Sequence, residues 1–275
     1  NLLIVYTTAL LRIWYTHNRF FHKFSLRKDC FVMKKTAIIT GASRGIGKAI
    51  ALSLASEGYH LALFCHKNID MLNTLAGMLT STYQVEVYTY AGDIADPGFT
   101  IPACDDAIEK LSHVNVLINN AGIAHIGLLA DMSIDEWNDI IGTNLSSLFY
   151  TVKAAVPSMV AKKSGNIINI SSMWGTVGAS CEVAYSTAKG GVNSFTKALA
   201  KELAPNGIAV NAIACGVVDT DMNSILSSED RVSLAEEIPI GRFCSPEEIA
   251  EVVLNTIKAP SYMTGQIIGV DGGFI

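Results

Sequence analysis

Short apolar segments alternate with longer amphipathic ones from residue 36 to residue 270, and this alternation constrains the fold more than any other feature. Apolar runs typical of buried strands occupy residues 36–40, 60–65, 85–90, 114–119, 166–171, 208–213 and 266–270. Helical patterns separate them, over residues 45–57, 69–81, 102–111, 134–162, 183–203 and 246–258. Strands that alternate with helices form a parallel sheet covered on both faces. The sequence therefore predicts a single α/β domain, a doubly wound Rossmann-type fold with a mostly parallel sheet.

The chain has the length and composition of one large globular domain. Its 275 residues are 50% hydrophobic, which is ample for a buried core. Residues 1–32 hold five basic residues and one acidic residue, whereas the rest holds 15 basic and 24 acidic residues. An acidic body argues against a nucleic-acid partner. The six cysteines and six histidines show no metal-ligand spacing, so we expect reduced cysteines, no metal and a cytoplasmic location.

The first 32 residues do not continue the alternation of strands and helices. Asn1–Tyr15 is apolar apart from Arg12, but it is shorter than the roughly 20 apolar residues that a membrane-spanning helix needs. Met33 and the two lysines after it resemble the start of a protein, directly before the first strand. We interpret residues 1–32 as an extension outside the fold and residues 33–275 as the domain. A membrane anchor is the alternative, but no membrane partner is expected.

A glycine-rich turn joins the first strand to the first helix, in the order Gly41-Ala42-Ser43-Arg44-Gly45-Ile46-Gly47. Glycines let backbone N–H groups approach a pyrophosphate, and the helix N-terminus behind them favours negative charge. The spacing G-x-x-x-G-x-G differs from the common dinucleotide pattern G-x-G-x-x-G. Its position between a buried strand and a helix nevertheless predicts a dinucleotide site.

Tyr185 and Lys189 lie four residues apart in a predicted helix, and Ser172 ends a strand 13 residues before the tyrosine. Side chains at positions i and i+4 share one face of a helix. A fixed ammonium near a phenol favours the ionised phenol and lowers its pKa from about 10. We therefore expect an activated tyrosine. The spacing taken alone also fits an ordinary amphipathic helix with one solvated lysine.

Together these motifs resemble the short-chain dehydrogenase/reductase family over nearly all of Lys34–Ile275. Thr40–Gly47 is similar to the cofactor motif of that family, and residues 119–122 to its N-N-A-G motif. The resemblance implies a catalytic tetrad of Asn144, Ser172, Tyr185 and Lys189. In that tetrad the tyrosine is the general acid, and the serine binds the developing oxyanion. The lysine lowers the pKa of the tyrosine and holds the nicotinamide ribose. The asparagine orders a proton-relay water.

The same resemblance implies which residues contact the cofactor. They are Gly41, Ser43, Arg44, Gly45, Ile46, Gly47, His66, Asp93, Ile94, Asn120, Ala121, Gly122, Tyr185, Lys189, Gly216, Val218 and Thr220. Asp93 also fits a simple turn or helix-capping carboxylate. The family usually has proline where this chain has Cys215. Proline would fix φ near −65°, so cysteine predicts a looser turn at that point.

The end of the second strand favours NADPH over NADH. In dinucleotide folds an acid at that position binds the adenosine ribose, whereas a basic environment accepts a 2′-phosphate. Here Cys65 occupies the position of the acid, His66 and Lys67 follow it, and Arg44 lies in the glycine-rich turn. No carboxylate would repel the phosphate there, and the cationic groups could bind it.

Within the family the chain looks most like the 3-oxoacyl-acyl-carrier-protein reductases of fatty acid biosynthesis. The expected reaction is hydride transfer from NADPH to the ketone carbonyl of a 3-oxoacyl thioester. A sugar, polyol or small-alcohol dehydrogenase of the same family is the first alternative. A non-enzymatic, dinucleotide-sensing regulator on the same fold is the second.

Partners are predicted less directly than the reaction. Lys162, Lys163 and Lys201 offer a basic patch for an acyl carrier protein, but Asn206 stands where such reductases often have arginine. The C-terminal motifs resemble those of family members that form homotetramers, and we expect the same assembly. Residues 222–240 have the irregular composition of a lid over the substrate.

Overall fold

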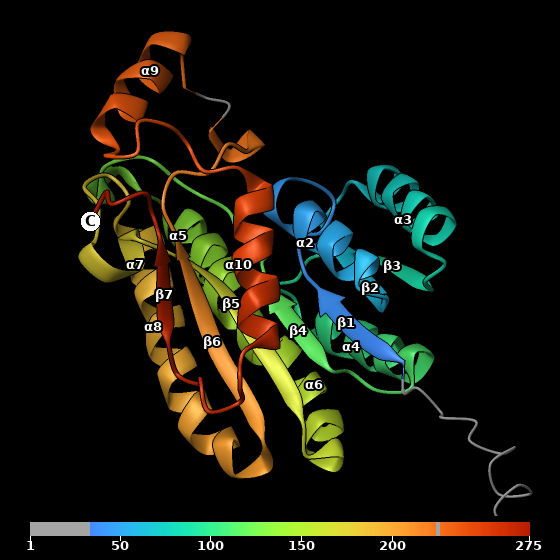
Figure 1. Cartoon of the computed structure of the whole chain (residues 1–275). Coiled ribbons are helices and arrows are strands. Elements are labelled where there is room, and N and C mark those ends of the chain that lie inside the picture. Colours follow the sequence, from blue (N-terminus) through green and yellow to red (C-terminus); the bar gives the residue numbers. More distant parts are fainter. Residues whose placement is uncertain (1–33, 224–225) are drawn as a thin grey trace, which may run out of the picture. The chain divides into compact units, whose positions relative to one another are not determined.

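A sheet of parallel strands forms the centre of the protein in the computed structural model, which describes residues 34–223 and 226–275 (Figure 1). Within these residues the sheet has seven strands, in the spatial order β3-β2-β1-β4-β5-β6-β7. Their bounds are β1 Lys35–Ile39, β2 Tyr59–Cys65, β3 Val87–Ala91, β4 Val116–Asn119, β5 Gly165–Ser172, β6 Ile208–Cys215 and β7 Ile267–Val270. All six neighbouring pairs are parallel. The predicted Rossmann-type fold is confirmed.

The order in which strands are added to the sheet reverses at β1, which pairs with β2 on one side and with β4 on the other. Successive strands first build outward from β1 to β3, and then outward in the other direction from β4 to β7. The connections at β1 and β4 therefore leave the sheet toward opposite faces. Such a switch point opens a crevice at the carboxyl ends of the strands, where ligands bind in open α/β sheets.

Helices cover both faces of the sheet (Figure 1). The main ones are α2 Gly45–Ser56, α3 Ile69–Tyr83, α4 Pro97–Leu111, α5 Ile134–Ile141, α6 Ser147–Lys162, α8 Val183–Leu203 and α10 Pro246–Lys258. Buried side chains of α2, α3 and α10 form one apolar core against the sheet. Those of α4, α6 and α8 form a second core on the other face. The two layers hold the strand ends, and with them the site, in fixed positions.

Helix α4 begins five residues earlier than predicted. The Asp96 side chain accepts a hydrogen bond of 2.8 Å from Gly98 N and so caps the helix, and Pro97 occupies its first turn. Proline suits a first turn because its missing N–H would have no helical partner there. Pro102, predicted to start the helix, lies inside it.

The long helix predicted over residues 134–162 is interrupted. Residues Gly142–Ser146 form a π-helical turn between α5 and α6. A π turn inserts one extra residue into a helix and is frequent at functional sites. Asn144 lies within this turn, so the interruption reorients one of the predicted site residues.

The segment expected to be irregular contains a helix, α9 Ser228–Glu237. Ser227 and Asp230 form a reciprocal capping box at its start. Arg231 donates to Asp219 at 2.7 Å and lies 4.8 Å from the centre of the Phe243 ring. The expectation of an irregular segment was therefore wrong for residues 228–237. None of the residues of α9 is buried, so its sequence lacks the apolar periodicity that marks a helix packed on a core.

Several expectations concern residues outside the described ones. The proposed extension over residues 1–32 is among them, and so is Cys30. Of the helices in the described part of the chain, none combines the length and apolarity required to cross a membrane. The other five cysteines are unpaired.

Candidate active site

The carboxyl ends of β1, β4, β5 and β6 lie next to one another and carry most of the predicted site. Ile39 is paired with Ile118 in the neighbouring strand, and Ser172 is paired with Cys215. Three predicted parts of the site therefore lie side by side at the carboxyl end of the sheet: the glycine-rich turn, the N-N-A-G motif and Ser172. Helix α8 brings Tyr185 and Lys189 to the same end.

The glycine-rich turn has a conformation that requires its glycines. Gly41 and Gly45 have φ values of +65° and +53°, a region that favours glycine. A Cβ on Gly47 would collide with the carbonyl oxygen of Gly41 and lie 2.6 Å from Asn120 Nδ2. No side chain caps the N-terminus of α2, and its first turn holds no acidic residue. A tight backbone cradle at an uncapped helix N-terminus fits the pyrophosphate of a dinucleotide.

Asn120 ties this turn to the end of β4. Its side-chain Nδ2 donates to the carbonyl oxygens of Thr40 and Gly41, at 2.9 and 3.0 Å. The Thr40 hydroxyl in turn accepts from the backbone N–H groups of Asn120 and Ala121, both at 3.0 Å. The Asn120 side chain thus holds the glycine-rich turn rather than standing free for the adenosine ribose. A direct ribose contact would fall to the backbone of residues 120–122.

Ser172, Tyr185 and Lys189 form a compact cluster. The Ser172 hydroxyl lies near enough to the Tyr185 phenol to favour its ionised form, and it also accepts from Trp174 N at 3.2 Å. Lys189 Nζ donates to the carbonyl oxygen of Ile170 at 2.8 Å and lies 5.6 Å from the centre of the Tyr185 ring. Lys189 is buried. The phenol therefore has a hydroxyl and an ammonium beside it.

The electrostatics of this cluster differ from the prediction. Burial raises the pKa of Tyr185 above its ordinary value, and the nearby Ser172 hydroxyl opposes the rise only in part. Burial also lowers the pKa of Lys189 to about 8. The expected lowering of the tyrosine pKa is absent because loss of hydration disfavours the phenolate more strongly than its neighbours stabilise it.

Gly122 lies between the Ser172–Tyr185–Lys189 cluster and the glycine-rich turn. A Cβ at this position would lie 2.8 Å from Asn144 Oδ1 and 3.7 Å from Lys189 Nζ. Asn144 itself binds the backbone of Ile123, donating to its carbonyl oxygen at 2.8 Å and accepting from its N–H at 2.9 Å. The N-N-A-G segment thus reaches from the glycine-rich turn to the tetrad, and the predicted tetrad residues share one site.

Comparison with known proteins agrees with this geometry. A model of the short chain dehydrogenase family matches residues 35–231. The chain belongs to the short-chain dehydrogenase family. The family and the oxidoreductase names of its relatives show that the chain is an oxidoreductase.

Three relatives illustrate the similarity. The uncharacterized oxidoreductase YmfI of Bacillus subtilis (strain 168) is 40% identical over 248 residues, which cover 88% of this chain and 99% of that protein. The 3-oxoacyl-[acyl-carrier-protein] reductase FabG of Aquifex aeolicus (strain VF5) is 37% identical over 240 residues, 87% of this chain and 96% of the relative. The protein of the same name from Staphylococcus aureus (strain Mu50) is 39% identical over 243 residues, 88% of this chain and 98% of the relative.

In this short-chain dehydrogenase the end of β2 carries no carboxylate. Cys65 is buried there, and burial raises the pKa of its thiol. His66 and Lys67 follow on the surface. Arg44, at the start of α2, has its guanidinium 3.2 Å from the Asp221 carboxylate. The Asp93 carboxylate accepts from Ala95 N at 2.9 Å in a local turn, which is its alternative role, and Ile94 after it is buried.

The segment after β6 closes the site on the other side. Cys215 does not interrupt the strand: it is the last residue of β6 and pairs with both Ser172 and Val270. The turn that follows is close-packed, because a Cβ on Gly216 would lie 2.7 Å from Asp271 Cα. Burial raises the pKa of the Cys215 thiol to about 12, so it is no activated thiolate. Val218 is buried.

Two features of this short-chain dehydrogenase were missed from the sequence. A buried network beneath the site joins Asn119 to Asn169 and Thr151, at 2.9 and 2.7 Å, and Asn169 to Thr196 at 2.9 Å. Asparagines inside apolar strand runs were the available signal. The second feature is Glu182, whose carboxylate has a pKa raised by burial and lies close enough to Tyr185 to raise the pKa of the phenol.

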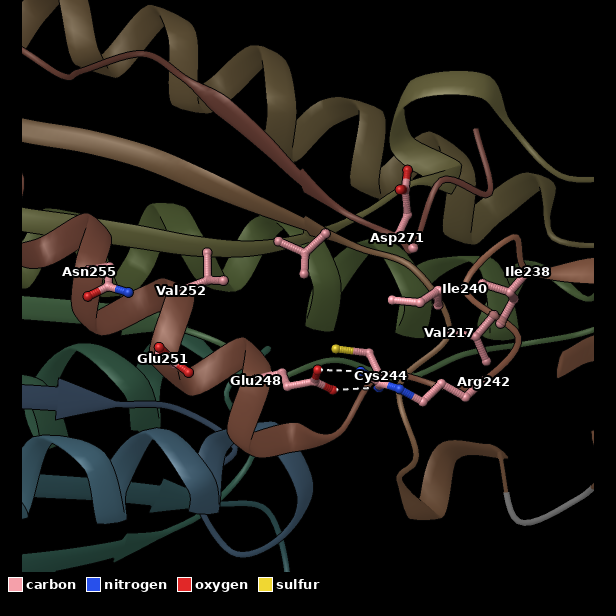
Figure 2. A pocket seen from close by; sticks show the side chains of 12 residues that line it. Val217, Ile238, Ile240, Arg242, Cys244, Glu248, Glu251, Val252, Asn255 and Asp271 are labelled. Atoms are coloured by element: carbon pink, nitrogen blue, oxygen red, sulfur yellow. Dashed lines mark hydrogen bonds and ion pairs between the residues drawn. The ribbon is translucent and has the colours of Figure 1, made fainter.

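A pocket of about 320 Å³ lies beside this site, between α10 and the end of β7 (Figure 2). Arg242 and Glu248 face each other there in a two-pronged ion pair of 2.8 and 2.7 Å. That pair lowers the pKa of Glu248 to about 2. None of the tetrad residues lines this pocket, and its charged pair is already mutually satisfied. We therefore do not assign the reaction to it.

Proposed function

We propose that this oxidoreductase is an NADPH-dependent reductase that acts on a ketone carbonyl, with a 3-oxoacyl thioester as the first candidate substrate. The observation that carries the proposal is the cluster of Ser172, Tyr185 and Lys189 beside Gly122 and the glycine-rich turn. When bound, NADPH supplies the hydride. The residues that would hold it are those of the turn, the backbone of residues 120–122, and Thr220 with its neighbours after β6.

The raised pKa of Tyr185 suits a proton donor. A buried phenol stays protonated at neutral pH, so it can give its proton to the carbonyl oxygen as that oxygen gains charge. The Ser172 hydroxyl, next to the phenol, would donate to the same oxygen. The ammonium of Lys189 then stabilises the phenolate that proton transfer leaves behind. The Asn144 side chain ties the π turn to the backbone of Ile123 and so holds both segments next to this cluster.

The 2′-phosphate of NADPH is supported by the absence of an acid at the end of β2 and by the nearby basic residues. Cys65 is an uncharged thiol, His66 and Lys67 follow it on the surface, and Arg44 lies in the glycine-rich turn after the neighbouring strand β1. An acid there would instead bind the ribose hydroxyl of NADH.

The thioester is supported by the names of two relatives, but the carrier-docking residues are unusual. Lys162 and Lys163 end α6, and Asn206 directly precedes β6. These positions lie at the amino ends of β5 and β6, whereas Ser172 ends β5 at the opposite edge. A carrier protein bound at that patch would not face the site of the same chain. We therefore propose the thioester as substrate and leave the carrier as a further partner, with a homotetramer as the expected assembly.

The deciding experiment follows NADPH oxidation with acetoacetyl-coenzyme A, acetoacetyl-acyl carrier protein, simple ketones and sugars. We expect the thioesters to have the highest kcat/KM and NADPH to be preferred over NADH. A higher kcat/KM for sugars or polyols, measured in the oxidative direction, would instead establish the alternative dehydrogenase. Turnover that persists undiminished in a Tyr185→Phe variant would contradict the mechanism itself.

A further inference from the structure

Arg44 and Asp221 form an ion pair beside the glycine-rich turn. Arg44 precedes the first turn of α2, and Asp221 begins the short helix Asp221–Asn223 in the segment after β6. Their side chains approach to 3.2 Å, and their exposed fractions are 59% and 63%. The two segments also pack together beside the pair, because a Cβ on Gly45 would lie 3.1 Å from the side-chain Cγ2 of Thr220. Two segments almost 180 residues apart in sequence are therefore joined by this ion pair.

The surroundings of the pair are acidic. Asp219 and Glu247 line the same surface pocket of about 230 Å³ as Asp221, together with the single cation Lys48. Asp219 is already bound by Arg231 at 2.7 Å. Asp221 is the carboxylate in contact with the guanidinium of Arg44. Arg44 therefore faces a competing anion on this side.

We propose that Asp221 is a specificity-determining residue that binds the Arg44 guanidinium in competition with the 2′-phosphate of NADPH. This inference rests on the proposed use of NADPH. A phosphate prefers the planar, multi-donor guanidinium of arginine, and Asp221 occupies part of that donor set. A carboxylate near the phosphate would also repel it, over a range that salt limits to about 8 Å at physiological ionic strength.

The expected effect is small because exposed ion pairs are weak. Removing the charge with Asp221→Asn should tighten NADPH binding about two- to fivefold, and raised salt should reduce the gain. NADH lacks the 2′-phosphate, so its affinity should change much less. Asp221 then moderates the preference for NADPH without touching the reacting atoms.

The test measures dissociation constants of NADPH and NADH by nicotinamide fluorescence and calorimetry, on the full chain. Wild type is compared with Asp221→Asn, Arg44→Ala and the double variant. Glu247→Gln is the matched control, because it removes a carboxylate from the same pocket that does not pair with Arg44. We expect Asp221→Asn to tighten NADPH selectively, the control to act less, and the gain to disappear in the Arg44→Ala background.

Three results would overturn the inference. They are no change in NADPH affinity with Asp221→Asn, an equal gain for NADH, or a gain that persists without Arg44. In each case NADPH use stands if wild type still binds NADPH more tightly than NADH. Tighter binding of NADH by wild type would instead contradict the proposed cofactor, and with it this inference. Thermal melting of each variant separates altered binding from altered folding.

Discussion

The glycine-rich turn and the Ser172–Tyr185–Lys189 cluster lie at the same edge of the sheet but are built in different ways. The turn is held by its backbone: positive φ values, close approaches that exclude a Cβ, and hydrogen bonds from Asn120. The cluster is held by side chains, and its properties depend on how deeply they are buried. Backbone geometry follows from residue type, whereas electrostatics follows from the whole surrounding fold. The first is therefore readable from a motif and the second is not.

The largest expected effect falls on the cluster. Tyr185→Phe removes the phenolic proton and keeps the ring, so kcat should fall by about 10²–10⁴-fold. NADPH affinity should stay within about threefold of wild type, because the turn is unaffected. Steady-state kinetics and fluorescence titration check the two parts. Equal losses of rate and of cofactor affinity would show that the two regions are not separable.

The turn is tested by a pair of helical glycines. Gly47→Ala places a methyl against the Gly41 carbonyl and Asn120, which should cost about 1–3 kcal/mol of unfolding free energy. NADPH affinity should also fall by about tenfold or more, roughly 1.4 kcal/mol. The matched control is Gly77→Ala in α3, where a Cβ meets no atom within 4 Å.

That control should make the protein more stable by about 0.5–1 kcal/mol, because alanine is the better helix former. Chemical denaturation of both variants measures the difference. Similar stabilities for the two would mean that the turn does not require its glycine.

Lys189→Met tests the electrostatic character of the cluster. A buried ammonium whose pKa is lowered from 10.5 to about 8 destabilises the fold wherever the amine is charged, so the variant should be more stable at pH 7. The expected gain is about 1–3 kcal/mol. Above pH 8 the folded protein loses the proton while the unfolded chain keeps it, so the gain should shrink toward pH 10.5.

The comparison cancels the titration of groups that do not interact with Lys189. The Cys215 thiol does interact with it, but this thiol stays protonated in the folded protein up to pH 10 because burial raises its pKa to about 12. Unfolding free energies at pH 7, 8.5 and 10 provide the measurement. A variant that is less stable than wild type at pH 7 would indicate that the bond from Lys189 to the Ile170 carbonyl outweighs the loss of hydration.

The smallest effect concerns Glu182. Burial is the main cause of the raised pKa of Tyr185, and the Glu182 carboxylate adds to it. Glu182→Gln should therefore lower that pKa by a few tenths of a unit. The tyrosinate absorbance of each protein, minus that of its Tyr185→Phe counterpart, provides the measurement. Glu202→Gln, on the same helix but far from the site, is the control. An unchanged Tyr185 pKa in both variants would remove Glu182 from the electrostatics of the site.

Much of the fold could be predicted because its signals are local. Helices α8 and α10 have the predicted bounds, since apolar periodicity and clear starts and stops mark both. The π turn around Asn144 could not be predicted, because an extra residue in a helix leaves the periodicity nearly unchanged. Helix α9 lacked an apolar face altogether. The pKa direction of Tyr185 depends on burial by segments distant in sequence, and no spacing rule contains that information.

Helix α9 has one further consequence. No residue of α9 is buried, and its described side-chain contacts with other segments are those of Arg231. Substitutions in this helix should therefore change the free energy of unfolding very little. A graft of residues 228–237 from another family member should therefore leave the stability of the two apolar cores nearly unchanged.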